Sequence, residues 1–459
     1  MVLRDIPEMK IAIIGAGIVG LSVARELSRY DAEIHIFERE EDVGMGTSKA
    51  NTGIIHAGFD DPPNSVRAQY ARRGNEIWHR WVQELHIPTS WKGEIIVARD
   101  YEGMKKIEEL KRRGIENGVP GLEIWDRTKL LKMEPKLSKE VQGALFAQSG
   151  GVMESFFAPV ALYENLRDNG VFFHFNAPVE DLIERGDKIE IRSRVNDKFD
   201  LVINAAGLYA DRIAEMMGYS FRIFPKKGEY LLFPKITLQL NYIIFPTPHK
   251  GTKGVVIENT PAGTLMIGPN AQEIGDKEDK STTAEGLDFV YNTAKSLVPS
   301  LPPREKSMRQ FSGLRAETED MDFIITLRDN FWNLAGMRSP GLTAAPAIAE
   351  HVAAEAKKRY NLKRREGWVA KRVPYPRGGK LVCDCEGITE MEVREAVRRG
   401  AGTVEGVKRR TMATMGSCQG SFCIPKIMSI IAEERSLEYE QVLLKDSGWI
   451  VRKIKKGKH

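Results

Sequence analysis

The sequence predicts a mixed α/β and α+β chain, in which an open Rossmann-type domain is interrupted by a mostly antiparallel sheet and followed by a small helical domain. Three observations predict this fold class. Residues 10–38 contain an apolar run, a glycine-rich turn, a helical pattern and a second apolar run, as in a βαβ unit. Residues 218–327 contain longer, irregular strand patterns. All four cysteines lie between residues 383 and 423, after a stretch rich in proline and glycine.

The stretch from residue 10 to residue 38 has the features of a phosphate-binding turn. Its apolar run, Ile11 to Ile14, is short enough for a fully buried parallel strand. In the GxGxxG motif that follows, the first glycine allows a tight turn, the second lets the backbone approach a pyrophosphate, and the third lets the helix pack on the strand. The helix that begins at Ile18 offers free N–H groups to phosphates, and Glu38 ends the second strand, where an acid can bind a ribose. The stretch predicts a dinucleotide, either NAD or FAD, at Gly15, Gly17 and Gly20.

Length and composition limit the number of domains and the classes of partner that the chain can have. At 459 residues the chain has room for two or three domains. The formal net charge of +5 is small for this length and does not favour nucleic acid as a partner, and only residues 452–459 are strongly basic, as expected of a solvated terminus. No run approaches ~18 apolar residues, and no signal-peptide pattern is present. We therefore expect a cytoplasmic protein, in which any contact with the inner face of a membrane would need a partner or a surface association.

A glycine-rich polar segment, residues 44–59, follows Glu38 and is expected to lie against a bound ligand. Its small side chains Thr47, Ser48 and Asn51 could bind phosphate or ring oxygens together with backbone N–H groups. His56 follows an apolar pair in the same segment. An ordinary surface loop would also be polar but would rarely contain GIIHAG.

The chain then alternates between amphipathic helices and short strands. Apolar residues at helical spacing predict a helix over 64–86, whose Trp78 and Trp81 belong to the core. The apolar strand 200–207 ends in small residues, where the sheet could again meet a nucleotide. Further helices are expected at 101–117, 126–133, 157–169 and 209–217, and strands at 94–98, 143–146, 150–153, 172–175, 178–184 and 188–193.

The pattern changes after residue 218, where we expect an inserted, mostly antiparallel sheet. Its strands are expected at 229–233, 242–245, 254–259 and 264–267, with one helix at 283–297. A last strand precedes a helix that begins near Thr343, where a threonine can cap free amides and the helix dipole suits an electron-rich ring. Residues 363–380 have the composition of a linker.

The four cysteines form two close pairs. The spacing is Cys383-x-Cys385, then 32 residues, then Cys418-x4-Cys423. Such clustering is unlike a disulfide framework and, in a reducing compartment, indicates metal or redox chemistry. Two pairs of thiolates suit an iron–sulfur cluster. On spacing alone, a zinc site is the alternative.

Five motifs occur along the chain in the order of a known superfamily. They are GAGIVG at 15–20, INAAG at 203–207, KGEYLL at 227–232, SGLRAETED at 312–320 and GMRSPGLTAAPA at 336–347. From Lys10 to about residue 355 the chain therefore resembles the FAD-dependent D-amino-acid oxidase-like superfamily. This superfamily includes glycerol-3-phosphate dehydrogenases, L-2-hydroxyglutarate oxidases, and glycine and sarcosine oxidases.

The resemblance implies FAD as cofactor and transfer of a hydride to flavin N5 from a C–H bond next to oxygen or nitrogen. It also implies that phosphates lie on the glycine motif, that Glu38 binds the ribose, and that the backbone of Val179 meets the adenine. The cofactor-binding residues that it implies are Gly15, Gly17, Ile18, Val19, Gly20, Glu38, Arg39, Thr47, Ser48, Asn51, Gly53, Ile54, Val179, Ala206, Gly207, Gly313, Arg315, Ser339, Pro340, Gly341, Leu342 and Thr343.

Two further resemblances concern the branch of the superfamily and the cysteine-containing segment. Residues 51–69, 245–258 and 266–271 are most similar to the 2-hydroxyglutarate oxidase branch, which also contains proteins labelled as glycerol-3-phosphate dehydrogenases. Residues 382–423 resemble the bacterioferritin-associated-ferredoxin-like [2Fe–2S] domain. That resemblance makes Cys383, Cys385, Cys418 and Cys423 the cluster ligands, with zinc as the lesser alternative.

The fusion of these two parts resembles the catalytic subunit of anaerobic-type glycerol-3-phosphate dehydrogenase. It implies that electrons pass to an acceptor protein or a second subunit. The implied division is an FAD-binding domain of residues 1–80, 140–217 and 328–362, a substrate domain of residues 81–139 and 218–327, the linker at 363–380, and a [2Fe–2S] domain of residues 381–459.

A small anionic substrate needs fixed cations. Arg315 matches the superfamily's arginine that faces the flavin, and arginine binds phosphate or carboxylate in a bidentate manner. Lys253 and His249 lie on the inserted sheet, and Arg338 precedes the flavin-contacting SPG; for these three, a structural or solvated role is the alternative. His56 is the expected base for the hydroxyl proton.

The favoured function is oxidation of sn-glycerol 3-phosphate to dihydroxyacetone phosphate. The same chemistry on L-2-hydroxyglutarate or another 2-hydroxy acid is the first alternative. An amine dehydrogenase subunit for proline or sarcosine is the second. An electron-transfer flavoprotein without a substrate of its own is the third.

Overall fold

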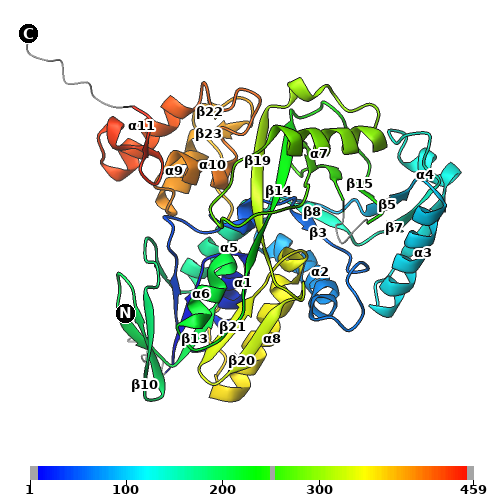
Figure 1. The fold of residues 1–459 in the computed structure, drawn as a ribbon. Coiled ribbons are helices and arrows are strands. Elements are labelled where there is room, and N and C mark those ends of the chain that lie inside the picture. The colour runs from blue at the N-terminus through cyan, green and yellow to red at the C-terminus, as the bar shows by residue number, and fades with distance from the viewer. Residues whose placement is uncertain (1–8, 249–253, 452–459) are drawn as a thin grey trace, which may run out of the picture. The chain divides into compact units, whose positions relative to one another are not determined.

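The computed structural model describes residues 9–248 and 254–451, so Lys253 and His249 lie outside the described residues. The chain forms two compact units, which are described separately (Figure 1). The first comprises Met1–Arg39 and Val43–Lys371, and the second comprises Glu40–Asp42 and Arg372–His459. The finer division of the first unit into FAD-binding and substrate domains stays a prediction.

The predicted open sheet is present in the first unit as six strands in the order β20-β21-β13-β1-β2-β9. All neighbours are parallel except the antiparallel edge strand β20. Strand β1 lies inside the sheet, where Ile13 is in register with Ile203 on one side and Ile36 on the other. The strands are β1 (Lys10–Ile14), β2 (Glu33–Phe37), β9 (Phe172–His174), β13 (Leu201–Asn204), β20 (Ile324–Arg328) and β21 (Phe331–Ala335).

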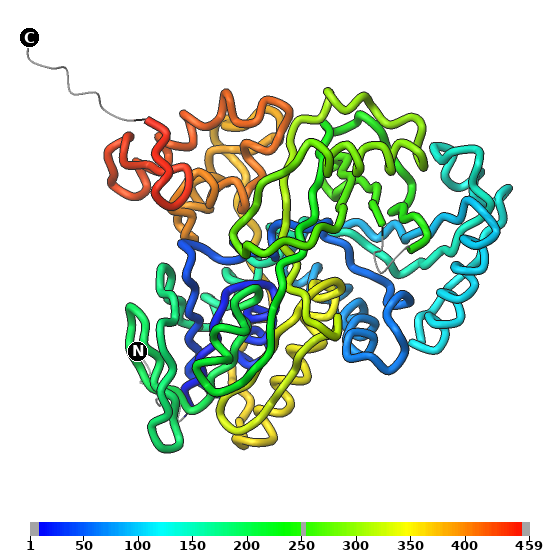
Figure 2. Tube along the Cα trace, viewed as in Figure 1, coloured from blue at the N-terminus to red at the C-terminus, as the bar shows by residue number. Residues whose placement is uncertain are grey.

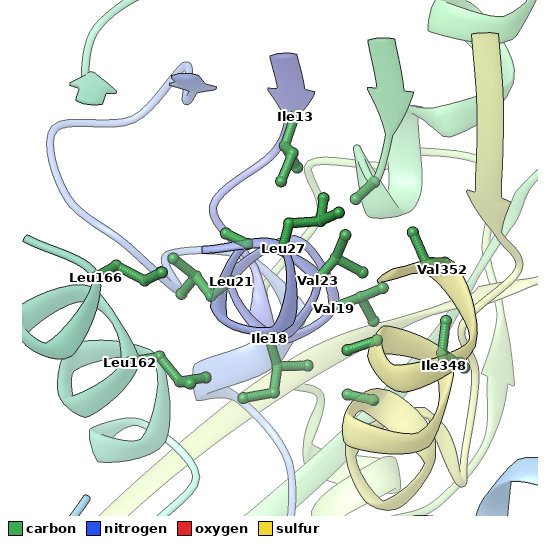
Figure 3. Close-up of a cluster of buried hydrophobic side chains, with 14 of the residues drawn as sticks. Ile13, Ile18, Val19, Leu21, Val23, Leu27, Leu162, Leu166, Ile348 and Val352 are labelled. Atoms are coloured by element: carbon green, nitrogen blue, oxygen red, sulfur yellow. The ribbon is translucent and has the colours of Figure 1, made fainter. Parts of the chain in front are cut away.

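Helices α1 (Ile18–Leu27), α5 (Phe157–Asp168) and α8 (Gly341–Tyr360) cover one face of this sheet. All residues of α1 are buried, including the charged Arg25, which pairs with Glu84 at 2.6 Å. Helix α8 runs beside α1 and α2 (Val66–Glu84), although these elements are far apart in the sequence (Figure 2). Figure 3 shows α1 between side chains of α5 and α8, namely Leu162, Leu166, Ile348 and Val352.

The opposite face of the sheet packs on a small antiparallel sheet and a short helix. Side chains of β1 alternate between the two cores, so that Ile11 faces the helices and Ala12 faces the other side. The covering elements are β10 (Asp181–Arg185), β11 (Lys188–Arg192), β12 (Asp197–Phe199) and α6 (Ala210–Glu215). The nucleotide motif is therefore held in the middle of a layered core.

Among the described residues, the inserted sheet has nine strands and, as predicted, is mostly antiparallel, with β15 and β5 as a parallel pair. Strand β7 pairs with β5 and β6 in this sheet, although it lies within the range 140–217 that was expected in the FAD-binding domain. The strands are β5 (Glu94–Ala98), β6 (Leu122–Asp126), β7 (Gly143–Ala147), β14 (Phe224–Phe233), β15 (Ile243–Pro246), β16 (Val256–Asn259), β17 (Leu265–Gly268), β18 (Gln272–Glu273) and β19 (Arg309–Glu317).

Helix α7 (Ala284–Leu297) covers one face of the inserted sheet together with α4 (Arg127–Met133), and α3 (Tyr101–Glu116) packs on the other face. Thr283 caps α7, because its side chain accepts a hydrogen bond from the Gly286 N–H at 3.1 Å. The buried carboxylate of Glu229 accepts the Thr283 N–H at 2.5 Å. A Cβ at Gly286 would lie 1.5 Å from Glu229 Oε2, so only glycine lets α7 dock here.

A small three-stranded sheet places the histidine of the GIIHAG segment. Strand β3 (Ile54–Ile55) pairs with β8 (Gly151–Met153), and β8 also pairs with β4 (Thr89–Ser90). His56 therefore follows directly after a buried strand, whose position is fixed by two other segments.

Glu258 is a fully buried carboxylate on β16 of the inserted sheet. Neither of its side-chain oxygens has a hydrogen-bond partner among the described residues. Burial raises the pKa of Glu258 well above its usual value, and the nearby Lys92 ammonium partly opposes this change. Burial also lowers the pKa of Lys92.

We expect the stability of the protein to depend on pH through Glu258. Because its pKa is raised in the folded state, its contribution to stability is complete below about pH 4.3, the ordinary glutamate value, and is lost as the pH rises through the folded-state pKa. Glu258→Gln cannot ionise, so its Tm relative to the unchanged protein should rise by roughly 2 °C or more as the pH increases from about 5. Thermal unfolding at each pH measures this difference. The exposed Glu319→Gln is the control, and a Tm difference for Glu258→Gln that does not change with pH would contradict the expectation.

The second unit is a small helical domain, as predicted. Helix α9 begins with a capping box formed by Thr389 and Glu392, and Thr403 caps α10. The three helices pack around a core that includes Val393, Val407 and Ile431. Its elements are α9 (Glu390–Arg398), α10 (Val404–Thr411), α11 (Ile424–Arg435) and the short strands β22 (Leu381–Cys383), β23 (Ile388–Thr389), β24 (Leu443–Lys445) and β25 (Gly448–Trp449).

A segment from the N-terminal part of the sequence, Glu40–Asp42, belongs to the second unit. The buried Asp42 carboxylate accepts hydrogen bonds from Arg409 and from both terminal nitrogens of Arg410, the latter at 2.6 and 3.0 Å. Both arginines are almost fully buried. Charges that are this deeply buried need such pairing.

Within residues 9–248 and 254–451, no helix is both long enough and apolar enough to cross a membrane.

Candidate active site

A cavity of about 750 Å³ lies in the first unit, within the range of about 300–1,000 Å³ that is usual for ligand sites. Its walls come from both large sheets. The nucleotide-binding side contributes the start of α1, residues 47–56 and the start of α8. The inserted sheet contributes β14, β15, β16 and β19, and α7 contributes residues at one side. The segments that sequence analysis singled out thus meet at one cavity.

The glycine motif forms a close-packed turn in front of α1. Gly15 has a φ of +107°, and a Cβ there would lie 2.5 Å from the Ala205 carbonyl oxygen. A Cβ at Gly20 would lie 2.1 Å from the Gly15 carbonyl oxygen, so the helix could not approach the turn. The predicted reasons for these two glycines are confirmed. Gly17 and the first residues of α1 line the cavity itself.

Polar groups around the turn are arranged for an anion. Ser48 Oγ accepts the Ile18 N–H at 2.9 Å, which leaves the serine O–H as a donor toward the cavity side of the helix start. One oxygen of Glu38 accepts the Ala16 N–H at 2.8 Å. The helix dipole adds partial positive charge at the same place.

The loop at 47–53 is held by its own side chains. Thr47 Oγ1 donates to the Leu314 carbonyl oxygen at 2.7 Å. Asn51 Nδ2 donates to the carbonyl oxygens of Thr47 and Ser48, and Asn51 Oδ1 accepts the Gly53 N–H at 2.8 Å. These contacts keep the backbone of the loop against the cavity. Asn51 and Thr47 thus shape the loop, a role that the sequence did not indicate.

The start of α8 also faces the cavity, with Ser339, Pro340, Gly341, Leu342 and Thr343 in its wall. Helix α2 holds this helix start in place. Trp78 Nε1 donates to the Leu342 carbonyl oxygen at 3.0 Å, and a Cβ at Gly74 would lie 1.9 Å from the Thr343 carbonyl oxygen. Trp78 is a core residue, as predicted.

His56 lies in the cavity wall with its backbone fixed on both sides. Its N–H donates to Thr343 Oγ1 at 3.0 Å, and its carbonyl oxygen accepts from Asn75 Nδ2 at 3.0 Å. Its ring Nε2 is 3.3 Å from Ser339 Oγ. Its side chain is only 13% exposed, so the imidazole can exchange a proton with a ligand in the cavity rather than with bulk water.

Arg315 and Lys226 form a pair of cations on the cavity-facing side of the inserted sheet. They are directly opposite in the register of β19 and β14, and both line the cavity. Like charges at opposite positions destabilise a sheet unless they are compensated. Lys226 Nζ lies 3.8 Å from the exposed Glu273 carboxylate, and the two cations make this side of the cavity positively charged. A Cβ at Gly228 would lie 3.0 Å from Arg315 Nη2, so the glycine leaves room for the guanidinium. Lys226 belongs to no motif that marks it in the sequence, although the alternation of β14 places it on the same face as Tyr230.

Tyr230 supports Arg315 from the same strand face. Burial raises the pKa of its hydroxyl, and its hydrogen bond with Arg315 opposes that change. Arg315 Nη2 also approaches the Asn270 carbonyl oxygen at 3.4 Å. The guanidinium is therefore oriented within the cavity before a ligand binds.

Arg338 lines the cavity but already has a charged partner. Its Nε lies 2.9 Å from Glu317 Oε2, with both side chains largely buried. Burial lowers the pKa of Arg338, and Glu317 opposes this. This ion pair fits the structural role that is the alternative for Arg338.

Several predicted cofactor residues lie outside the cavity wall. Gly313 is a packing position, because a Cβ there would lie 1.9 Å from the Ala50 carbonyl oxygen. Exposed Arg39 pairs with Glu278 at 3.1 Å. The other predicted residues that do not line the cavity are Gly15, Gly20, Glu38, Gly53, Val179 and Ala206.

The four cysteines of the second unit meet as two pairs. The thiols of Cys383 and Cys423 hydrogen-bond each other, and so do those of Cys385 and Cys418. Among the described residues, no three His, Cys, Asp or Glu side chains converge as they would around one metal ion. A [2Fe–2S] cluster takes two thiolates at each iron. Two pairs of thiols are a donor set that fits such a cluster.

Comparison with known families identifies both units. The family described as FAD dependent oxidoreductase matches residues 10–355. The family described as BFD-like [2Fe-2S] binding domain matches residues 381–433. The cavity, the glycine turn and the two helix starts fit a dinucleotide, and the thiol pairs fit a two-iron cluster.

Individual relatives extend this result. A glycerol 3-phosphate dehydrogenase of Caloramator mitchellensis is 38% identical, over 94% of this chain and 95% of the relative. A mitochondrial L-2-hydroxyglutarate dehydrogenase of Arabidopsis thaliana is 28% identical, over 74% of this chain and 82% of the relative. The structure of dithionite-reduced L-alpha-glycerophosphate oxidase from Mycoplasma pneumoniae with FAD bound superposes with a TM-score of 0.76 at 28% identity, covering 80% of this chain and 99% of that one. The chain therefore belongs to the FAD-dependent oxidoreductases, carries a BFD-like domain after its FAD-binding part, and has FAD and a [2Fe–2S] cluster as cofactors.

Proposed function

We propose that this protein oxidises sn-glycerol 3-phosphate to dihydroxyacetone phosphate and passes the electrons to a partner protein. The observation that carries the proposal is that one cavity contains an imidazole and two cross-strand cations, next to the dinucleotide turn. A base and an anion site are what oxidation of a phosphorylated alcohol requires. The 38% identity to a glycerol 3-phosphate dehydrogenase along nearly the whole chain supports the choice of substrate.

Arg315 and Lys226 would bind the phosphate. A guanidinium can donate two parallel hydrogen bonds to a phosphate, and the ammonium adds a second positive charge on the same sheet face. Arg338 is engaged with Glu317, which favours a role in holding the start of α8 over direct contact with substrate. Lys253 and His249 keep their predicted roles as further substrate ligands.

His56 would take the proton from the substrate hydroxyl. Its Nε2 lies on the cavity side, where it contacts Ser339, and it can accept the O–H proton as the carbonyl forms. Bound FAD supplies the acceptor for the hydride that leaves the same carbon atom. Proton and hydride together account for the two electrons and two hydrogens that the alcohol loses.

The chain's contribution to cofactor binding would come from two helix starts. Gly17, Ile18 and Val19, together with the Ser48 hydroxyl, would bind the pyrophosphate. Ser339 to Thr343 at the start of α8 would contact the ring system. Glu38 keeps a predicted role at the ribose.

The [2Fe–2S] cluster supplies one-electron chemistry, which suits delivery of electrons to an acceptor protein or a second subunit. We propose a cytoplasmic location in which any contact with a membrane is made by that partner. The thiolates of the second unit would then serve redox chemistry and not only its folding.

Anaerobic reduction of the flavin tests the proposal. Addition of sn-glycerol 3-phosphate should bleach the yellow absorbance of the oxidised flavin. L-2-hydroxyglutarate is the second candidate, because it too is anionic and a relative is named for it. Bleaching by L-2-hydroxyglutarate alone would overturn the proposed substrate, and absence of bleaching by any hydroxy acid or by proline or sarcosine would overturn the proposed class of reaction.

A further inference from the structure

Glu94 is a buried carboxylate behind His56 that sequence analysis did not single out. It begins β5 and is 0% exposed. Its Oε1 accepts the Ala57 N–H at 2.8 Å. Its Oε2 has no hydrogen-bond partner among residues 9–248 and 254–451, and it lies 3.6 Å from His56 Nδ1. The one unsatisfied oxygen of this carboxylate therefore faces the imidazole.

The backbone around His56 is held in place next to Glu94. The backbone groups on both sides of the ring are bound by Thr343, by Asn75 and by Glu94 itself. The space for the carboxylate comes from Gly150, where a Cβ would lie 2.8 Å from Glu94 Cγ. The imidazole is thus held between a buried carboxylate at Nδ1 and the cavity at Nε2.

We propose that Glu94 is a positioning residue, which accepts the Nδ1–H of His56 and so leaves the lone pair of Nε2 directed into the cavity. The inference rests on the proposed function, in which His56 accepts the substrate proton. The distance of 3.6 Å is longer than a hydrogen bond. Such contacts are often long without substrate and shorten when substrate binds.

The physical reason for this arrangement is the cost of an unpaired buried charge. A carboxylate oxygen that is removed from water and has no donor is unfavourable. When His56 takes up a proton at Nε2, the ring becomes a cation directly beside that oxygen. Glu94 would then stabilise the charge that develops during proton transfer, as the carboxylate of a catalytic triad does for its histidine.

The decisive variant is Glu94→Gln, which has almost the same shape. Its amide oxygen can still accept the Ala57 N–H, but its NH₂ group would face Nδ1. An NH₂ group there requires Nδ1 to be the acceptor, so the proton moves to Nε2 and the base is blocked. We expect the rate of flavin reduction at saturating sn-glycerol 3-phosphate to fall about 10- to 100-fold, with the substrate Kd changed by less than about threefold.

Two comparisons separate positioning from general damage. Glu134→Gln removes another buried carboxylate of the first unit and should leave the rate unchanged. If Glu94 acts through His56, adding Glu94→Gln to His56→Asn should cause no further loss. Multiplicative losses in the double variant, or an equal loss in Glu134→Gln, would overturn the proposal.

A second measurement does not depend on activity. The tautomer of His56 can be read from ¹⁵N NMR of the histidine-labelled holoenzyme, with the His56 signals identified by their loss in His56→Asn. We expect the proton on Nδ1 in the unchanged protein and on Nε2 in Glu94→Gln. A proton on Nε2 of the unchanged protein would overturn the role of Glu94. If the unchanged protein does not oxidise sn-glycerol 3-phosphate, the proposed function fails while the tautomer still decides the role of Glu94.

Discussion

Replacement of His56 by asparagine should slow flavin reduction by sn-glycerol 3-phosphate by about 10²- to 10⁴-fold, the range that a positioned general base contributes. The substrate Kd should change little, because the proposed anion ligands Arg315 and Lys226 lie on the inserted sheet and are left unchanged. Asparagine keeps the backbone contacts to Thr343 and Asn75, so the fold around position 56 is retained. Anaerobic stopped-flow measurement of the bleaching rate at several substrate concentrations separates the rate from the Kd.

The matched control for this variant is His86→Asn. His86 is exposed and has a φ of +52°, a conformation that asparagine adopts well, so the substitution should be silent. A His56→Asn variant that reduces its flavin as fast as the unchanged protein would remove His56 from proton transfer. A raised Kd with an unchanged rate would instead assign His56 to substrate binding.

Replacement of Arg315 by alanine should weaken binding of sn-glycerol 3-phosphate by roughly 10²-fold or more. A hydrogen bond to a charged group contributes about 1.5–3 kcal/mol, and a guanidinium can donate two to one phosphate. The loss should appear mainly in the Kd, with Arg315→Lys intermediate because it keeps the charge and loses the paired donors. Titration of the flavin absorbance under anaerobic conditions measures it.

Arg309→Ala is the control for this prediction. Arg309 begins the same strand, β19, but its side chain is exposed and it does not line the cavity. We expect no change in its Kd. If Arg315→Ala binds the substrate as tightly as Arg309→Ala does, the phosphate is bound elsewhere, and Lys226 is the next residue to test.

Local features of the fold could be predicted because short segments determine them. The glycine turn depends on the positive φ of Gly15 and on two close contacts. One contact is with Ala205, directly after the neighbouring strand, and the other is between Gly20 and Gly15 within the turn. The helix at 284–297 and the helix at 66–84 follow from apolar spacing and end caps. The glycine turn alone left NAD and FAD as alternatives, and the family motifs further along the chain identified FAD.

Residues whose role depends on long-range packing were missed. Lys226 lies beside Arg315 only because strands β14 and β19, which are far apart in the sequence, pair in that register. No local pattern in the sequence marks the register. Glu94 begins an apolar strand, and only the folded chain places its carboxylate behind His56. Strand β7 pairs across the inserted sheet, because pairing partners are set by the sheet and not by order in the sequence. These roles depend on the register and packing of distant segments, which no local pattern in the sequence specifies.

The inclusion of Glu40–Asp42 in the second unit limits how this protein can be divided. A cut at the boundary between Lys371 and Arg372 leaves Asp42 in one fragment and leaves Arg409 and Arg410, two buried cations, in the other without their carboxylate. We therefore expect that the segment from Arg372 onward cannot be transferred to another protein without a carboxylate that replaces Asp42. A flavoprotein that receives it would have to supply an acidic residue from its own N-terminal region, so the two parts are expected to be inherited, engineered and expressed as one piece.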